Sequence, residues 1–195
     1  MTSPTYTQDL TLTANAYKLI SLLFGPPSDG LEEVLTHLEQ TLAILKPKLI
    51  PLVNEMKSLS DSESKLEDLT VDFAKLFIGP FDLLAPPYGS VYLDGQRRVM
   101  GDSTVKVLKF YRQAGLNLSD EFKEPPDHIV TELEFMYYLM AKHIETGDTH
   151  WLLMKEEFFE DYLSQWIKDF VARIQENAKN NFYKNLAQIS LELFS

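Results

Sequence analysis

A chain of 195 residues with 45% apolar residues is long enough for one domain with a sizeable core and too apolar for a disordered protein. Its formal net charge of −11 counts against a nucleic-acid-binding protein, which needs a basic surface. The absence of cysteine excludes disulfides, thiolate metal ligands and a cysteine nucleophile. No apolar run approaches the roughly 18 residues that span a bilayer, and residues 1–6 lack the basic region of a secretory signal, so we expect a cytoplasmic protein.

The charge is spread unevenly along the chain. Twelve acidic and three basic residues lie between Asp120 and Asp161, whereas five basic residues and one acidic residue lie between Gly95 and Gly115. An acidic field favours cationic partners and speeds their encounter. The alternative is a solvated acidic surface that only keeps the protein soluble, and composition by itself favours this alternative.

Apolar residues recur at helical spacing through the first 78 residues. The pattern predicts helices over about 7–24, 30–45, 48–59 and 61–78, with Asp29 as the cap of the second helix. The residues expected to face the core are Leu12, Ala16, Leu19 and Leu23 in the first helix, Leu31, Leu35, Leu38 and Leu42 in the second, and Leu66, Leu69, Phe73 and Phe77 in the fourth.

The helical pattern fails between Gly79 and Gly101, a stretch rich in proline and glycine. Loops longer than about 12–15 residues inside a domain are usually functional or disordered. This loop has many apolar and aromatic side chains, so we expect it to pack against the core rather than move freely. These side chains are Phe81, Leu83, Leu84, Tyr88, Val91 and Tyr92.

Helices are predicted again over about 103–114, 125–146, 148–177 (as one piece or two) and 182–194. Pro125 and Pro126 suit the first turn of a helix, where Asp127 would complement the helix dipole. No strand pattern and no internal repeat is present. We therefore expect an all-α protein with a single compact helical domain over residues 1–195. The expected core stripes of the two longest helices are Ile129, Leu133, Met136 and Met140, and Phe159, Leu163, Trp166 and Phe170.

The residues that could carry chemistry are few. His128 and Glu132 share a helix face and lie beside Asp127, but no second histidine stands at zinc-ligand spacing, so we expect no metal site. The alternative for His128 is a hydrogen-bonded residue at a capped helix start. Ser90 lacks the nucleophile elbow, and neither a phosphate-binding loop nor a dinucleotide fingerprint is present. We expect no cofactor, no catalytic residue and no enzymatic activity.

Several of these stretches resemble the TorD/DmsD family of redox-enzyme maturation chaperones, and the resemblance extends from about residue 14 to residue 194. The loop ending in Gly-Asp-Ser-Thr is most similar to the DmsD branch. The residues that carry the resemblance are Tyr17 to Gly25, Leu76 to Pro80, Ala85 to Asp94, Gly101 to Thr104, Glu124 to His128 and Glu132 to Met136.

The resemblance implies an all-α chaperone that binds the twin-arginine signal peptide of a molybdopterin oxidoreductase catalytic subunit of the dimethyl sulfoxide reductase type, before export. Tyr88 stands where DmsD often has tryptophan. The exchange of tryptophan for tyrosine keeps a flat apolar face with a polar edge. The positions that match leader-binding residues of the family are Leu76, Phe77, Pro87, Tyr88, Gly101, Asp127 and His128.

The residues themselves are compatible with that ligand, which is a basic segment followed by a mildly apolar one. Phe77, Leu84, Tyr88 and Tyr92 are candidates for an apolar groove. Asp127 and Glu132 are candidates to pair with arginine guanidinium groups, and His128 to orient Glu132. For Asp127 and His128 we expect side chains that project outward from the helix start.

Other interpretations remain open at this stage. The client could be a leaderless subunit of the nitrate-reductase type. A nucleotide-hydrolysing enzyme is a further alternative, and the missing phosphate loop counts against it. Some family members are said to bind guanine nucleotides, but the chain has no phosphate loop for one. The resemblance also implies transient contact with the twin-arginine export machinery and allows a monomer or a domain-swapped dimer.

Overall fold

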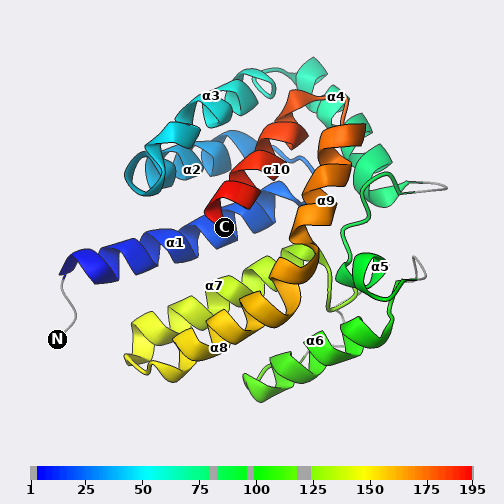
Figure 1. The fold of residues 1–195 in the computed structure, drawn as a ribbon. Coiled ribbons are helices and arrows are strands. Elements are labelled where there is room, and N and C mark those ends of the chain that lie inside the picture. Colours follow the sequence, from blue (N-terminus) through cyan, green and yellow to red (C-terminus); the bar gives the residue numbers. More distant parts are fainter. Residues whose placement is uncertain (1–3, 80–82, 96–98, 118–123, 195) are drawn as a thin grey trace.

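The computed structural model is all-α, as the periodicity predicts (Figure 1). It describes residues 4–79, 83–95, 99–117 and 124–194, which contain no strand; an isolated antiparallel bridge pairs Tyr88 with His128. Pro80, Phe81 and Asp120, which are named above, lie outside the described residues, as do Arg97, Arg98, Glu121 and Lys123, which belong to the two charged stretches. The helices are α1 (Pro4–Leu23), α2 (Leu31–Leu45), the 3-10 turn η1 (Pro47–Leu49), α3 (Ile50–Ser58), α4 (Glu63–Phe73), the π-helical η2 (Ala74–Ile78), α5 (Gly89–Leu93), α6 (Asp102–Gln113), α7 (Ile129–Thr146), α8 (His150–Phe158), the π-helical η3 (Phe159–Leu163), α9 (Ser164–Asn177) and α10 (Asn181–Leu193).

The core forms where α1 packs between α2 and α7 (Figure 1). α10 lies against α3 and α9, and α8 lies against α7. Buried apolar side chains from these helices join in one cluster. The stripes predicted for α2 and α7 are confirmed, since every residue named for them is buried.

The stripe predicted for α1 is partly wrong. Leu12 and Leu19 are only half-buried, whereas Tyr17 and Ile20 are buried. Because α1 has α2 on one side and α7 on the other, it buries a face wider than one stripe.

Several expected boundaries also differ in the structure. The loop at 79–101 contains a short helix, α5. Its packing is confirmed only in part: of the described side chains expected to pack, Val91 is buried, Leu83, Tyr88 and Tyr92 are half-buried, and Leu84 is exposed. α7 begins at Ile129, so the two prolines precede the helix instead of forming its first turn. Asp29 does not cap α2; the capping position belongs to Gly30, which has no side chain to offer.

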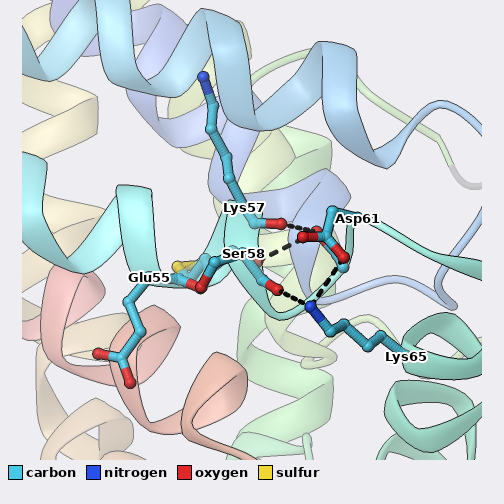
Figure 2. Close-up of polar contacts among 7 residues, drawn as sticks. Glu55, Lys57, Ser58, Asp61 and Lys65 are labelled. Carbon is cyan, nitrogen blue, oxygen red and sulfur yellow. Dashed lines mark hydrogen bonds and ion pairs between the residues drawn. The ribbon is translucent and has the colours of Figure 1, made fainter.

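Lys65 fixes the corner between α3 and α4, as Figure 2 shows. Its Nζ donates to the Ser58 carbonyl oxygen at 2.6 Å and to Asp61 Oδ1 at 2.8 Å. A cation at the last carbonyl groups of a helix complements the helix dipole. This corner sets the direction of α4, whose continuation η2 leads into the 79–101 loop. None of the helices in the described ranges is long and apolar enough to cross a bilayer.

Candidate functional site

The two stretches that carry most of the resemblance meet at a backbone bridge. The Gly89 N–H donates to the Asp127 carbonyl oxygen, and the Ile129 N–H donates to the Pro87 carbonyl oxygen, both at 2.9 Å. This pattern makes Tyr88 and His128 a non-hydrogen-bonded pair, in which opposite side chains lie closest. Their rings meet edge to face with centroids 5.2 Å apart. The structure therefore brings Pro87, Tyr88, Asp127 and His128 together.

Asp127 does not project outward, so that prediction is wrong. Its side chain is only 1% exposed, and Oδ2 accepts a hydrogen bond from the Ser90 N–H at 2.7 Å. Oδ1 is buried and has no hydrogen-bond partner among the described residues. The physical reason is that Asp127 precedes α7, in a turn that faces the start of α5. Asp127 thus holds residues 89 and 90 in place, through its carbonyl oxygen and its carboxyl group.

Glu132 is likewise not available to a guanidinium group on the surface. It is 1% exposed, and Oε2 accepts a hydrogen bond from Trp166 Nε1 at 3.0 Å. Burial raises the pKa of this carboxyl well above its usual value, so the neutral acid is favoured. The prediction that Glu132 pairs with a peptide arginine is wrong, because the first turn of α7 directs the Glu132 side chain toward Trp166 of α9.

His128 is the cap of α7, which is the structural alternative left open by the sequence. Its Nδ1 accepts a hydrogen bond from the Val130 N–H at 3.2 Å, and it does not contact Glu132 through a hydrogen bond. Burial lowers the pKa of this imidazole, while the charges of Glu124 and Asp127 oppose that shift. The neutral ring is the form that can accept the capping bond.

The remaining predicted residues have structural roles around this bridge. Leu76 and Phe77 are buried; the Phe77 ring packs on Phe24, Phe73, Phe170 and Tyr183, so it belongs to the core and not to an open groove. Tyr92 is half-buried, with its ring stacked 5.5 Å from that of Trp166 and its hydroxyl donating to the Pro86 carbonyl oxygen at 2.8 Å.

Gly101 lies further along, before α6, and its role is to leave space. A Cβ at this position would lie 1.9 Å from Asp94 Oδ2. The same Asp94 carboxylate accepts hydrogen bonds from Ser103 Oγ at 2.9 Å and from the Ser103 N–H at 3.2 Å. Asp94 thereby caps α6 from nine residues away, and Gly101 makes room for it.

Among the described residues of this site, Glu124 offers an accessible carboxylate, although no sequence motif singles it out. It is exposed, and the Tyr88 hydroxyl lies 3.5 Å from its Oε2. Tyr88 is half-buried, and Leu84 nearby in the chain is 39% exposed. The signal available in the sequence was that Glu124 opens the Glu-Pro-Pro-Asp-His stretch and precedes the prolines, where a side chain is free of the helix.

Comparison with known proteins identifies the family. The nitrate reductase delta subunit family matches residues 26–172, which is most of the chain. The chain belongs to this family. It is 28% identical to the chaperone protein TorD of Shewanella pealeana over 190 residues, 89% of this chain and 82% of the relative. It is 32% identical to the Tat proofreading chaperone DmsD of Salmonella typhimurium over 124 residues, 64% of this chain and 57% of the relative.

A solved structure supports the fold. A protein of Archaeoglobus fulgidus described as a redox enzyme maturation protein superposes with a TM-score of 0.58 at 23% identity, over 92% of this chain and 93% of the other. The resemblance to TorD and DmsD chaperones and the all-α fold are thus confirmed. A member of the nitrate reductase delta subunit family with TorD and DmsD relatives is a chaperone and not an enzyme, which sets aside nucleotide hydrolysis.

Proposed function

We propose that the chain binds the twin-arginine signal peptide of a molybdopterin oxidoreductase catalytic subunit, of the dimethyl sulfoxide reductase type, and holds it in the cytoplasm until export. Relatives named as a Tat proofreading chaperone and as TorD chaperones support this proposal. Transient contact with the export machinery follows from the same role.

The observation that carries the proposal is the pairing of Tyr88 with Glu124 at the surface. A guanidinium group can form two parallel hydrogen bonds with a carboxylate and can lie over an aromatic face. Glu124 offers the carboxylate, and the half-buried Tyr88 ring offers the face. One arginine of the leader would replace the long Tyr88–Glu124 contact with stronger, charge-assisted bonds.

The buried carboxyl groups position this surface. Asp127 accepts from the Ser90 N–H and from the Gly89 N–H, so it fixes the backbone on the C-terminal side of Tyr88. Glu132 supports the same region indirectly, because the Trp166 ring that it binds also lies 3.0 Å from the place where a Gly89 Cβ would be. Neither carboxyl group needs to touch the peptide for its loss to weaken binding.

Calorimetric titration with two synthetic leaders tests the proposal. One leader has the arginine pair and the other has lysine at both positions, which keeps the charge but removes the planar two-bond geometry. We expect the lysine peptide to bind at least about tenfold more weakly, which corresponds to a loss of about 1.4 kcal/mol of binding free energy. Equal binding of the two peptides, or no binding of either, would contradict the proposal.

A leaderless subunit of the nitrate-reductase type is the second candidate client, and the description of the matching family favours it. The two candidates can be separated by titration with a catalytic subunit of the dimethyl sulfoxide reductase type, prepared once with its leader and once with the leader removed. Binding that depends on the leader supports the first candidate, and equal binding of both forms supports the second.

A further inference from the structure

α6 presents a basic face to solvent on a chain of net charge −11. Lys106, Lys109 and Arg112 follow each other at three-residue intervals along this helix, and all three are exposed. Val105, which is 50% exposed, extends the same face. In the ranges that the structure describes, none of these three cations forms an ion pair. The basic side chains therefore stabilise neither the core nor a neighbouring carboxylate.

An acidic face lies along α8 and η3. Glu156, Glu157, Glu160 and Asp161 are exposed, and their spacing places them on one side of the continuous helix. Leu153, 64% exposed, lies one turn earlier on that side. The base among these residues, Lys155, is half-buried, with its Nζ 5.6 Å from the centre of the Phe159 ring, so the face stays acidic.

The basic and acidic helices are neighbours in the fold. The Phe110 ring of α6 lies 5.4 Å from the Phe158 ring and 5.5 Å from the Tyr162 ring. Figure 1 shows α6 and α8 along the same edge of the molecule. At about 1.5 Å per residue, α6 and the α8–η3 helix are about 18 and 21 Å long, which is a close match.

We propose that this edge is a docking surface for a second copy of the chain, in which the α6 face of each protomer lies on the α8–η3 face of the other. A twofold interface uses the same patch on both protomers, so it needs a patch that is complementary to itself. Adjacent helices of opposite charge meet this requirement, and Val105 and Leu153 would add apolar contact. This dimer exchanges no helix, so it differs from a domain swap, and it does not depend on leader binding.

An anionic membrane or an acidic protein partner fits the edge less well. Either would be attracted by the α6 face but repelled by the four carboxylates on the neighbouring helix. Only a partner that carries both signs, in the reverse order, satisfies both faces. Because exposed ion pairs are weak and screened by salt, we expect a dimer that dissociates as the ionic strength rises.

Charge reversal on each face tests the proposal by sedimentation equilibrium. The first variant combines Lys106→Glu, Lys109→Glu and Arg112→Glu, and the second combines Glu156→Lys, Glu157→Lys, Glu160→Lys and Asp161→Lys. All seven side chains are exposed, so unchanged helix content by circular dichroism serves as the check on folding. At low salt we expect the wild-type chain to approach twice its mass of 22.4 kDa and each variant alone to remain near 22.4 kDa.

A mixture of the two variants is the decisive sample. With every charge of one face reversed, the first variant has two acidic faces and the second has two basic faces, so together they should form a mixed dimer in which faces of opposite charge meet. A wild-type chain that stays monomeric at low salt overturns the proposal, even if it then binds vesicles of anionic lipid. A wild-type dimer whose reversed variants also dimerise alone, or fail to pair when mixed, overturns it as well, because that dimer would use another surface.

Discussion

Glu132 lies inside the core beside Trp166 and is favoured in its neutral form. Since the pKa of this carboxyl is higher in the folded chain than in the unfolded one, the unfolded chain loses this proton first as the pH rises. The contribution of Glu132 to stability is therefore fully present below the unfolded pKa of about 4.5 and decreases as the pH rises toward the folded pKa.

Glu132→Gln removes this pH dependence. Glutamine cannot ionise, and its carbonyl oxygen can still accept the bond from Trp166 Nε1. We expect the free energy of unfolding of the variant, minus that of wild type, to increase from about pH 5 to about pH 8, because only the wild-type value falls over this range. Urea unfolding at several pH values measures this difference. A difference that is constant with pH, or that moves the other way, would show that Glu132 is ionised in the folded chain.

Gly101 has a separate role that a double-mutant cycle can isolate. Gly101→Ala would place a methyl group where the Asp94 carboxylate lies, so the cap on α6 should be lost at a cost of about 0.5–2 kcal/mol of folding free energy. In an Asp94→Ala background the carboxylate is gone and only the Cβ of residue 94 remains, 3.2 Å from the added methyl group, so the same substitution should cost much less. Equal costs in both backgrounds, measured by urea unfolding, would mean that Gly101 is required for another reason.

At the scale of elements, Asp72 joins α4 to the turn between α9 and α10. Its carboxylate is 4% exposed, and Oδ2 accepts hydrogen bonds from the N–H groups of Lys179 at 3.0 Å and Asn180 at 2.9 Å. These bonds connect positions more than one hundred residues apart and hold the end of α4, from which η2 and the site loop continue.

Asp72→Ala should therefore lower the free energy of unfolding by more than an ordinary surface substitution does. A hydrogen bond to a charged group contributes about 1.5–3 kcal/mol, and two are lost here. Asp68→Ala is the matched control, because Asp68 lies one turn earlier on α4 and is exposed. We expect a loss of at least about 1.5 kcal/mol for the first variant and about 0.5 kcal/mol or less for the second, by urea unfolding. Similar losses would contradict this role.

The long helices could be predicted from the sequence because their periodicity reflects burial directly. Leu31, Leu35, Leu38 and Leu42 form one stripe because α2 packs on one side. The π-helical segments η2 and η3 could not be predicted, since one extra residue in a turn leaves no mark in the composition. The short α5 also escaped the pattern, because five residues are too few to show a helical period.

The candidate site could be predicted in its location but not in its orientation. The sequence places Tyr88 and His128 in the right stretches, and the structure pairs them. The burial of Asp127 depends on Ser90, which is 37 residues earlier and approaches only in the folded chain. No local rule about prolines or helix starts contains that contact, so the sequence could not show that Asp127 is buried while Glu124 is exposed.

At the scale of the whole molecule, the excess of acidic residues should draw a basic leader toward the chain from a distance. Screening acts within about 10 Å at 0.1 M salt, so leader affinity should fall with ionic strength while the apolar part of the contact persists. The attraction by the net charge of −11 and the specific contact at Glu124 can be separated by experiment. Removing one acidic charge changes the net charge very little, so a large loss of affinity would come from the contact.

Leader affinity of Glu124→Gln, measured by calorimetry beside the control Glu67→Gln, shows whether Glu124 receives an arginine of the leader. Both residues are exposed acids, so both variants lose the same charge. Glu67 belongs to α4, which Figure 1 shows apart from α5, the helix that begins directly after Tyr88. A charge-assisted hydrogen bond of about 1.5–3 kcal/mol predicts that Glu124→Gln binds the arginine leader about tenfold more weakly or worse, with an unchanged free energy of unfolding, while Glu67→Gln binds nearly as well as wild type. Equal affinities for the two variants would contradict the account and remove the Tyr88–Glu124 surface from the leader-binding site.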